Sequence, residues 1–178
     1  MRTIFLRLAV LTLVAFLLPF TSLAGEEGDQ ANDFESAFSR MKQLVGTWEG
    51  YGGKEGDRKV FFKYRLTGRQ SALVEEYFSS RGAEAGMITV YHMDGQDLRL
   101  THYCSARNQP RMKASSYDPQ EGVVHFQFVD VTNLSEPNAY FTREVVLTWK
   151  DRDSIQIGFT GLYDGNEEKM VYTLTRAH

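Results

Sequence analysis

The sequence predicts an all-β domain, an antiparallel up-and-down barrel of about eight to ten strands preceded by one short α-helix. About ten short segments alternate apolar and polar residues, and they recur at roughly 8–12-residue spacing between turn residues. Only one short segment has a helical period, which excludes the alternating strands and helices of a parallel sheet. A meander closed into a barrel would leave no strand edge unpaired.

The first 24 residues have the layout of a secretory signal peptide. Arg2 and Arg7 precede an almost wholly apolar run at 8–20. Ser22 and Ala24 then provide small residues just before Gly25. We therefore expect a signal peptide at 1–24 and a secreted or periplasmic mature chain of 154 residues, with no membrane span left after cleavage. The alternative is an N-terminal membrane anchor, although the apolar run is short for a span of about 20 residues.

The rest of the chain has the size of one domain, at 33–178, after a flexible leader at 25–32 that is rich in Gly, Glu and Asp. Asp33 can cap a helix that begins at Phe34, because its carboxylate can accept a free N–H of the first turn. A helix at 33–45 would place its apolar residues on one face, and Gly46 would end it. These residues are Phe34, Phe38, Met41, Leu44 and Val45.

After Gly46 the apolar period changes from 3.6 to 2. The clearest alternation lies at 59–66, where Val60, Phe62, Tyr64 and Leu66 alternate with Lys59, Lys63 and Arg65. An Asp-Gly pair at 94–95 predicts a hairpin turn. We expect strands at 47–52, 59–66, 71–78, 87–93, 97–104, 112–117, 123–129, 139–149, 154–160 and 169–176, with a longer loop at 130–138.

Charge and cysteine content exclude several classes of protein. Loss of the two arginines with the signal peptide changes the formal net charge from −3 to −5, and acidic and basic residues are interspersed. Nothing therefore indicates a nucleic-acid-binding surface. Cys104 is the single cysteine, so an intramolecular disulfide is impossible. Its side chain is buried and inert, a free thiol, or a partner in a crosslink between two copies.

Two motifs carry a resemblance to known barrels. A short helix followed by Gly-Thr-Trp-x-Gly, within LVGTWEG at 44–50, resembles the entry to lipocalin-like (calycin) and nitrobindin-like barrels, in which the Trp closes one end. With VYHMDG at 90–95, the segment THYCSARNQPRM at 101–112 resembles uncharacterised secreted bacterial proteins that have a lipocalin-like domain of unknown function. The second resemblance covers most of the mature chain and implies a fold, from which function does not follow.

The resemblance to nitrobindins is limited to the entry motif and the strand rhythm. Nitrobindins bind haem through a histidine late in the chain. Here the only late histidine is His178, which belongs to no motif, so the haem role is not transferred and no cofactor is assigned.

Alternation at 97–104 places His102 and Cys104 on the face of Leu98 and Leu100, which we expect to be the barrel interior. Two residues apart on one strand, the His and the thiol are about 6–7 Å apart, which suits two groups lining one pocket and not a nucleophile with its base. We therefore consider His102 a pocket residue, as a hydrogen-bond partner or as a haem or metal ligand. The alternative is a core histidine beside a buried thiol.

Polar residues at 108–111 form a second candidate group, expected at the turn after this strand. Asn108 and Gln109 can donate and accept hydrogen bonds, and Arg111 has a planar fork suited to a carboxylate. At a barrel mouth they could orient a polar ligand head. Alternatively, Asn108 makes the turn and Arg111 pairs with a nearby carboxylate.

Two charged residues lie on faces that we expect to be apolar. Arg143 lies between Phe141 and Val145, and Glu76 lies between Val74 and Phe78. A buried Arg or Glu is costly unless it is paired. Arg143 could therefore pair with Glu76, could await an anionic ligand, or could lie on a face that the alternation misplaces.

These observations favour a secreted or periplasmic barrel that binds a small apolar or amphipathic molecule. The expected ligand contacts are Tyr64, His102, Cys104, Asn108, Gln109, Arg111 and Arg143. A hydrolase or isomerase that uses His102 is an alternative, and it requires a carboxylate on an adjacent strand, for example Glu76. A structural or interaction protein with a filled barrel is another. Cavity volume separates binding from a filled barrel.

Overall fold

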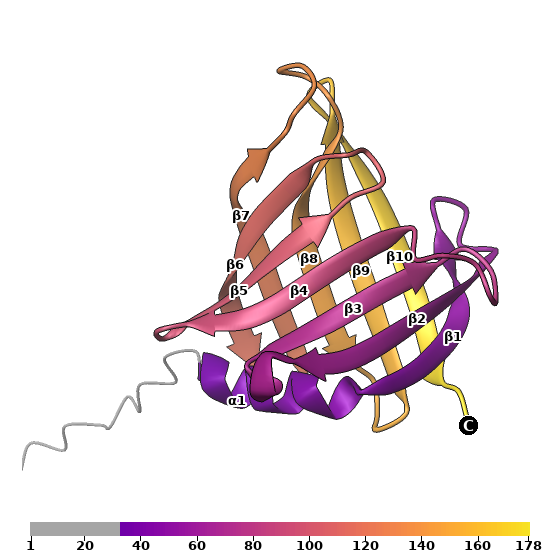
Figure 1. The fold of residues 1–178 in the computed structure, drawn as a ribbon, viewed down its shortest axis with the longest axis vertical. Helices are drawn as coiled ribbons and strands as arrows, with labels where there is room; N and C mark the ends of the chain where they lie inside the picture. Colours follow the sequence, from indigo (N-terminus) through magenta and orange to yellow (C-terminus); the bar gives the residue numbers. More distant parts are fainter. Residues whose placement is uncertain (1–32) are drawn as a thin grey trace, which may run out of the picture. The chain divides into compact units, whose positions relative to one another are not determined.

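The computed structural model describes residues 33–178, which form a closed barrel of ten antiparallel strands with a short helix before it (Figure 1). Each strand pairs with the next along the chain, and the last pairs with the first. This confirms the predicted fold class. The strands are β1 (Gly46–Gly53), β2 (Arg58–Thr67), β3 (Ala72–Phe78), β4 (Met87–Asp94), β5 (Asp97–Tyr103), β6 (Gln109–Asp118), β7 (Val123–Thr132), β8 (Phe141–Trp149), β9 (Ser154–Tyr163) and β10 (Asn166–Arg176).

The expected signal peptide and leader, at 1–32, lie outside the described residues. In the part of the chain that the structure describes, no helix is long and apolar enough to cross a membrane.

Helix α1 (Phe34–Met41) begins where the sequence predicts. The Asp33 carboxylate accepts the backbone N–H of Ser36 at 2.9 Å, which satisfies one donor of the first turn. A 3-10 turn at Lys42–Leu44 follows, and Gly46, with φ of +134°, then turns the chain into β1. The helix lies across one end of the barrel in Figure 1, and its apolar face joins the barrel core. This end is therefore closed.

Cross-strand pairing arranges the inward side chains of β2 to β6 in rows. One apolar row on the helix side is Leu66, Leu73, Tyr91, Leu100 and Met112, with each residue opposite the next. The next row is polar and consists of Tyr64, Glu75, Thr89 and His102. Beyond it lie Phe62, Tyr77 and Met87. The apolar core therefore fills the end near α1, and a polar layer lies above it.

The barrel closes by a tight contact between β1 and β10. Gly50 lies opposite Leu174, and a Cβ at Gly50 would overlap the carbonyl oxygen of Thr173. A side chain there would push the two strands apart, so the closing ladder requires glycine at this position.

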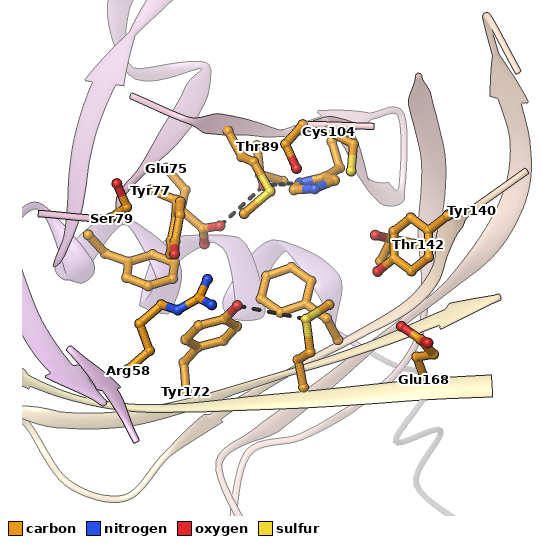
Figure 2. A pocket seen from close by; sticks show the side chains of 16 residues that line it. Arg58, Glu75, Tyr77, Ser79, Thr89, Cys104, Tyr140, Thr142, Glu168 and Tyr172 are labelled. Carbon is orange, nitrogen blue, oxygen red and sulfur yellow. Dashed lines mark hydrogen bonds between the residues drawn. The ribbon is translucent and has the colours of Figure 1, made fainter. Parts of the chain in front are cut away.

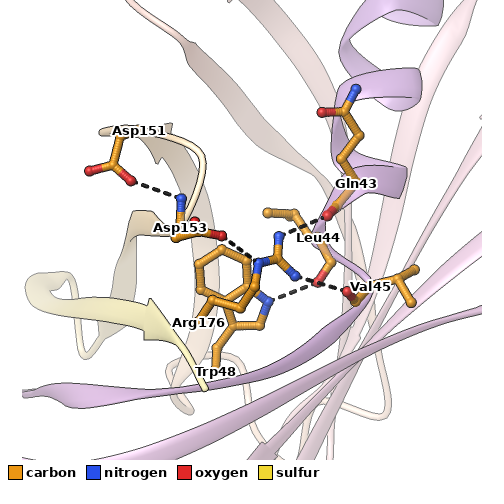
Figure 3. A network of polar contacts seen from close by, with 7 residues as sticks. All are labelled: Gln43, Leu44, Val45, Trp48, Asp151, Asp153 and Arg176. Carbon is orange, nitrogen blue, oxygen red and sulfur yellow. Dashed lines mark hydrogen bonds and ion pairs between the residues drawn. The ribbon is translucent and has the colours of Figure 1, made fainter. Parts of the chain in front are cut away.

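Arg176, at the end of β10, ties the closed end together (Figure 3). Its guanidinium donates to Asp153 Oδ1 at 2.8 Å and to the carbonyl oxygens of Val45 and Gln43 at 2.9 and 3.0 Å. It also stacks on the Trp48 ring at 4.4 Å, and the Trp48 indole N–H donates to the Leu44 carbonyl at 2.8 Å. One arginine and one tryptophan therefore join both closing strands to the turn after α1.

Candidate functional site

A cavity of about 380 Å³ occupies the half of the barrel away from α1. In Figure 2, Glu75, Thr89 and Cys104 lie along one wall, and Arg58, Tyr172 and Glu168 lie along the opposite wall. The lining is Arg58, Phe62, Glu75, Tyr77, Ser79, Met87, Thr89, His102, Cys104, Ser105, Tyr140, Thr142, Phe159, Glu168, Met170 and Tyr172. Aromatic rings and thioethers thus form much of the wall, with polar groups concentrated at two levels.

The deeper level is the polar row, whose centre is the carboxylate of Glu75. Oε2 accepts the hydroxyls of Tyr64 and Tyr91 at 2.8 and 2.9 Å, and Oε1 lies 3.2 Å from Thr89 Oγ1. Thr89 Oγ1 in turn lies 2.9 Å from His102 Nδ1. Because Tyr64, Glu75, Thr89 and His102 are directly opposed on four neighbouring strands, the barrel ladder itself holds this chain in place.

Burial dominates the electrostatics of this row. It raises the pKa of Glu75, although the bonds from the two tyrosines and Thr89 lower it in part. It lowers the pKa of His102 to about 4, so the imidazole is neutral at neutral pH. Desolvation, followed by the charge of Glu75, raises the pKa values of Tyr64 and Tyr91 well above their usual range. Burial therefore favours the protonated form of Glu75 and the neutral form of His102.

The raised pKa of Glu75 predicts that Glu75→Gln increases the free energy of unfolding relative to the wild type as the pH rises. A group with a raised folded-state pKa contributes stability that is present at low pH and is lost as the pH rises through that pKa. Glutamine carries no such charge, so the variant should gain on the wild type in free energy of unfolding as the pH rises. Urea unfolding at acid and alkaline pH measures this difference.

Glu76→Gln is the matched control for this experiment. Glu76 is the next residue on β3, but it faces outward and pairs with Arg65 at 3.5 Å. The Arg65 side chain of this pair is 47 % exposed, and an ion pair at the protein surface contributes about 0–1 kcal/mol. The Glu76 variant should therefore change the free energy of unfolding only slightly, and equal behaviour of the two variants would contradict burial as the cause.

The second polar level is at the mouth. Arg58 and Glu168 bring opposite charges to it, and Glu168 is also 3.6 Å from Lys54. Tyr140 lies against the backbone of Gly161, where a Cβ would overlap its ring, and burial raises the Tyr140 pKa. The residues before β8 therefore contribute a tyrosine to the cavity wall.

Two of the predicted ligand contacts, His102 and Cys104, line the cavity. His102 is 3 % exposed, on the face of Leu98 and Leu100, as the alternation predicts. Cys104 lies just past β5, half-buried and without a disulfide, and accepts the N–H of Ala106. Tyr64 is buried below the cavity, where it bonds Glu75, so it acts through that carboxylate.

The residues at 108–111 do not form the expected turn, since β6 already begins at Gln109. Asn108 is buried and donates to the Tyr140 carbonyl at 2.6 Å. Gln109 bonds the carbonyl of Arg107 and the hydroxyl of Thr132. Arg111 points outward and forms a bidentate pair with Asp130, which is the alternative considered for it. None of the three lines the cavity.

The inward placement of Arg143 is wrong, and so is that of Glu76. A β-bulge between Thr142 and Glu144 shifts the alternation of β8, so Arg143 is exposed and pairs with Glu167 at 3.2 Å. On β3 both faces carry apolar residues, and the face that points inward carries Glu75 instead of Glu76. The two residues therefore cannot pair with each other through the interior.

Several wall residues were not found from the sequence. Thr89 and Phe159 are residue types that are common in any strand, so the sequence does not single them out. Tyr77 and Tyr172 are two of the nine tyrosines in the chain and are not distinguished either. Glu75 had one usable signal, the position of Tyr64 on the clearly alternating β2, which becomes informative once the β2–β3 register is known.

A larger hollow, of about 920 Å³, lies at the closed end around Arg40, Trp149 and Arg176. Two of its arginines already have partners: Arg176 bonds Asp153, and Arg40 lies over the Trp149 ring and bonds the Pro119 carbonyl. Its floor belongs to the network that holds the helix to the strands, so the interior cavity is the better candidate site. Within residues 33–178, no group of three or more His, Cys, Asp or Glu side chains is placed to hold a metal ion.

Compared with known proteins, the chain matches no family model and no curated protein.

Proposed function

We propose that this protein binds a small amphipathic molecule inside the barrel. The observation that carries the proposal is the cavity of about 380 Å³, which has aromatic walls between a buried polar row and a charged mouth. Pockets for small ligands measure about 300–1,000 Å³ and are mostly apolar, with a few polar groups that fix orientation. This cavity has both properties, and its volume supports binding over a filled barrel with a structural role.

The upper walls suit the apolar part of such a molecule. Phe62 meets Tyr77 and Tyr172 edge to face, with centroids 5.4 and 5.6 Å apart, and Phe159 meets Tyr172 at 5.8 Å. These rings support one another and form a rigid surface around the space. Burial of apolar ligand area against them contributes about 25 cal/mol per Å².

The polar row suits the other end of the ligand. The Nδ1 atom of His102 contacts Thr89, and among residues 33–178 no protein group bonds its other nitrogen, Nε2. His102 lines the cavity, so a bound molecule can satisfy Nε2. Displacing water without replacing its hydrogen bond leaves a buried polar group unpaired, at a cost of about 1–3 kcal/mol. The site therefore favours ligands with one polar end over pure hydrocarbons.

The enzymatic alternative has less support. A general base works best with a pKa near the operating pH, whereas burial lowers the pKa of His102 to about 4. The carboxylate expected to assist it, Glu76, faces outward, and Glu75 reaches His102 only through the Thr89 hydroxyl. The row orients an imidazole well, but that imidazole is a weak base.

Secretion and membership of a lipocalin-like group belong to the same proposal. The signal-peptide layout at 1–24 and the entry motif at 44–50 support them. Trp48 in that motif packs at the closed end, fully buried and bonded to the Leu44 carbonyl, as an entry tryptophan that closes a barrel would.

Native mass spectrometry with an absorption spectrum tests the proposal. The full 178-residue chain would be expressed in a secreting bacterium and purified from the periplasm. We expect a protein mass that begins at Gly25 and a bound mass that is lost on denaturation, which also identifies the ligand. A bare mass that stays unchanged after exposure to fatty acids, aromatic alcohols and haem would contradict binding.

Neighbouring residues on β10 provide a matched pair of variants. Met170 lines the cavity, whereas Val171 is 44 % exposed on the outer face. Met170→Trp should fill part of the space and raise the Kd for the ligand about tenfold or more, equivalent to about 1.4 kcal/mol, and so lower its occupancy. Val171→Trp adds the same ring outside and should leave occupancy unchanged. Equal occupancy in both variants would place the ligand elsewhere.

A further inference from the structure

The polar row allows two proton arrangements. In one of them His102 Nε2 is a hydrogen-bond acceptor towards the cavity, and in the other it is a donor. Thr89 has a single hydroxyl proton and lies between Glu75 Oε1 and His102 Nδ1, at 3.2 and 2.9 Å. A hydroxyl that donates to one neighbour must accept from the other. The direction of donation at Thr89 therefore decides which nitrogen of His102 carries its proton.

In the first arrangement Glu75 is ionised. Oε2 accepts from both tyrosines and Oε1 accepts from Thr89, so Thr89 accepts the Nδ1–H of His102. A neutral imidazole has one N–H, which leaves Nε2 as a bare acceptor towards the cavity.

In the second arrangement Glu75 holds a proton on Oε1. That proton is donated to Thr89, the Thr89 hydroxyl is donated to Nδ1, and the imidazole proton is on Nε2. The two arrangements differ by one proton. When a proton arrives at Nε2 from the cavity, the Nδ1 proton moves to Thr89 and the Thr89 proton moves to Glu75. The two hydrogen bonds of Thr89 are then kept with their directions reversed, and the two tyrosines still donate to Oε2.

We propose that His102 Nε2 recognises the polar end of the ligand, and that the proton on Glu75 sets the class of group it takes. With Glu75 ionised, Nε2 takes a hydroxyl or N–H donor. With Glu75 protonated, Nε2 takes a carbonyl or carboxylate acceptor. The ligand class rests on the proposed function, whereas the coupling of the two protons does not.

Glu75 is the group of this row that can gain or lose a proton while its neighbours keep theirs. The titratable or charged groups that face it or its cavity are Tyr64 from β2, Tyr77 on β3, Tyr91 from β4, His102 from β5 and Tyr172 from β10, with Arg58, Cys104, Tyr140 and Glu168 nearer the mouth. Burial raises the pKa of Tyr172 to about 12 and those of Tyr64 and Tyr91 well above their usual range. The pKa of His102, about 4, keeps the imidazole neutral above that pH.

Nitrogen-15 NMR of the histidine side chains in the ligand-free full chain tests the coupling, over the pH range in which the barrel stays folded and above the His102 pKa of about 4. Protonated and bare imidazole nitrogens have well-separated shifts. We expect the His102 proton to lie on Nδ1 at high pH and on Nε2 at low pH. A single tautomer over the whole range, or protonation of both nitrogens, would overturn the proposal, whether or not the protein binds a ligand.

Three variants make the test sharper. In Glu75→Gln the amide oxygen faces the two tyrosines and the NH₂ group faces Thr89, so Nε2 should hold the proton at every pH. Thr89→Val removes the connecting hydroxyl and should make the tautomer independent of pH, whereas Thr89→Ser should restore the switch. A switch that survives in folded Thr89→Val would show that the proton does not pass through this hydroxyl.

Discussion

Trp48→Ala is expected to lower the free energy of unfolding by about 3–5 kcal/mol, the usual cost of replacing a buried tryptophan with alanine. The side chain is fully buried in the core cluster and meets the Tyr64 ring edge to face at 6.5 Å. Removal of the indole also exposes the face of the Arg176 guanidinium that stacks on the Trp48 ring at 4.4 Å. Domains of this size have a total stability of about 5–15 kcal/mol, so little would remain. Chemical denaturation followed by circular dichroism measures the loss.

Trp48→Phe separates the ring from its hydrogen bond. Phenylalanine keeps most of the apolar volume but leaves the Leu44 carbonyl without the indole N–H that reaches it at 2.8 Å. An unpaired buried acceptor costs about 1–3 kcal/mol, so we expect an intermediate loss. A Trp48→Ala loss below about 1 kcal/mol would mean that the closed end is held by α1 and Arg176 without the tryptophan.

The strand rhythm made the barrel predictable, because each strand is short, alternates strongly and ends at turn residues. The inward placement of His102 was predictable for the same reason, since Leu98 and Leu100 mark its face and both are buried. The helix was predictable from a local signal, the carboxylate of Asp33 and an apolar stripe of period 3.6. These features depend on residues that are close in the sequence.

Glu75 was not predictable, because both faces of β3 carry apolar residues. Val74 and Phe78 make one face look buried, and Leu73 and Tyr77 make the other look equally so. The choice depends on the register with β2, where Glu75 lies opposite Tyr64. That register is set by packing across the whole barrel. A slip of one residue would exchange the two faces, so local alternation alone could not decide.

Arg143 shows the second limit of alternation. Its neighbours Thr142 and Val145 both point inward, although they are an odd number of residues apart, because the bulge in β8 inserts one residue. A bulge leaves no clear mark in a single sequence when no glycine accompanies it. The polar row therefore had to be found from cross-strand partners, and it contains the one buried carboxylate of the described residues that touches three hydroxyls.

The polar row lowers the free energy of unfolding both at high pH and at low pH. The buried carboxylate of Glu75 has a raised pKa, so its contribution to stability is present in acid and is lost as the pH rises. The buried imidazole of His102 has a lowered pKa, so its contribution is present above the unfolded-state value of 6.5 and is lost as the pH falls towards about 4. The protein carries this double cost in the interior, at the boundary between the filled core and the cavity, which is where a binding site needs polar groups.

The histidine part of this cost predicts a large acid effect. Between neutral pH and about pH 4 the unfolded chain takes up a proton at His102 that the folded barrel resists. The change in pKa from 6.5 to about 4, at 1.36 kcal/mol per unit, corresponds to about 3 kcal/mol of stability. The wild type should therefore lose about 3 kcal/mol relative to His102→Gln as the pH falls over this range, because glutamine does not titrate.

The comparison is cleanest in a Glu75→Gln background, where the opposing carboxylate is absent from both proteins. Urea unfolding of Glu75→Gln and of Glu75→Gln/His102→Gln at several pH values gives the difference directly, and His125, half-buried on β7, supplies the control as His125→Gln. His125→Gln removes a histidine that does not line the cavity, and its effect on stability should be small. If His102→Gln behaved in the same way, the imidazole would be able to take up its proton inside the folded barrel. Water or an anion would then reach it, and the cavity would be a wetter and more open site than its aromatic walls indicate.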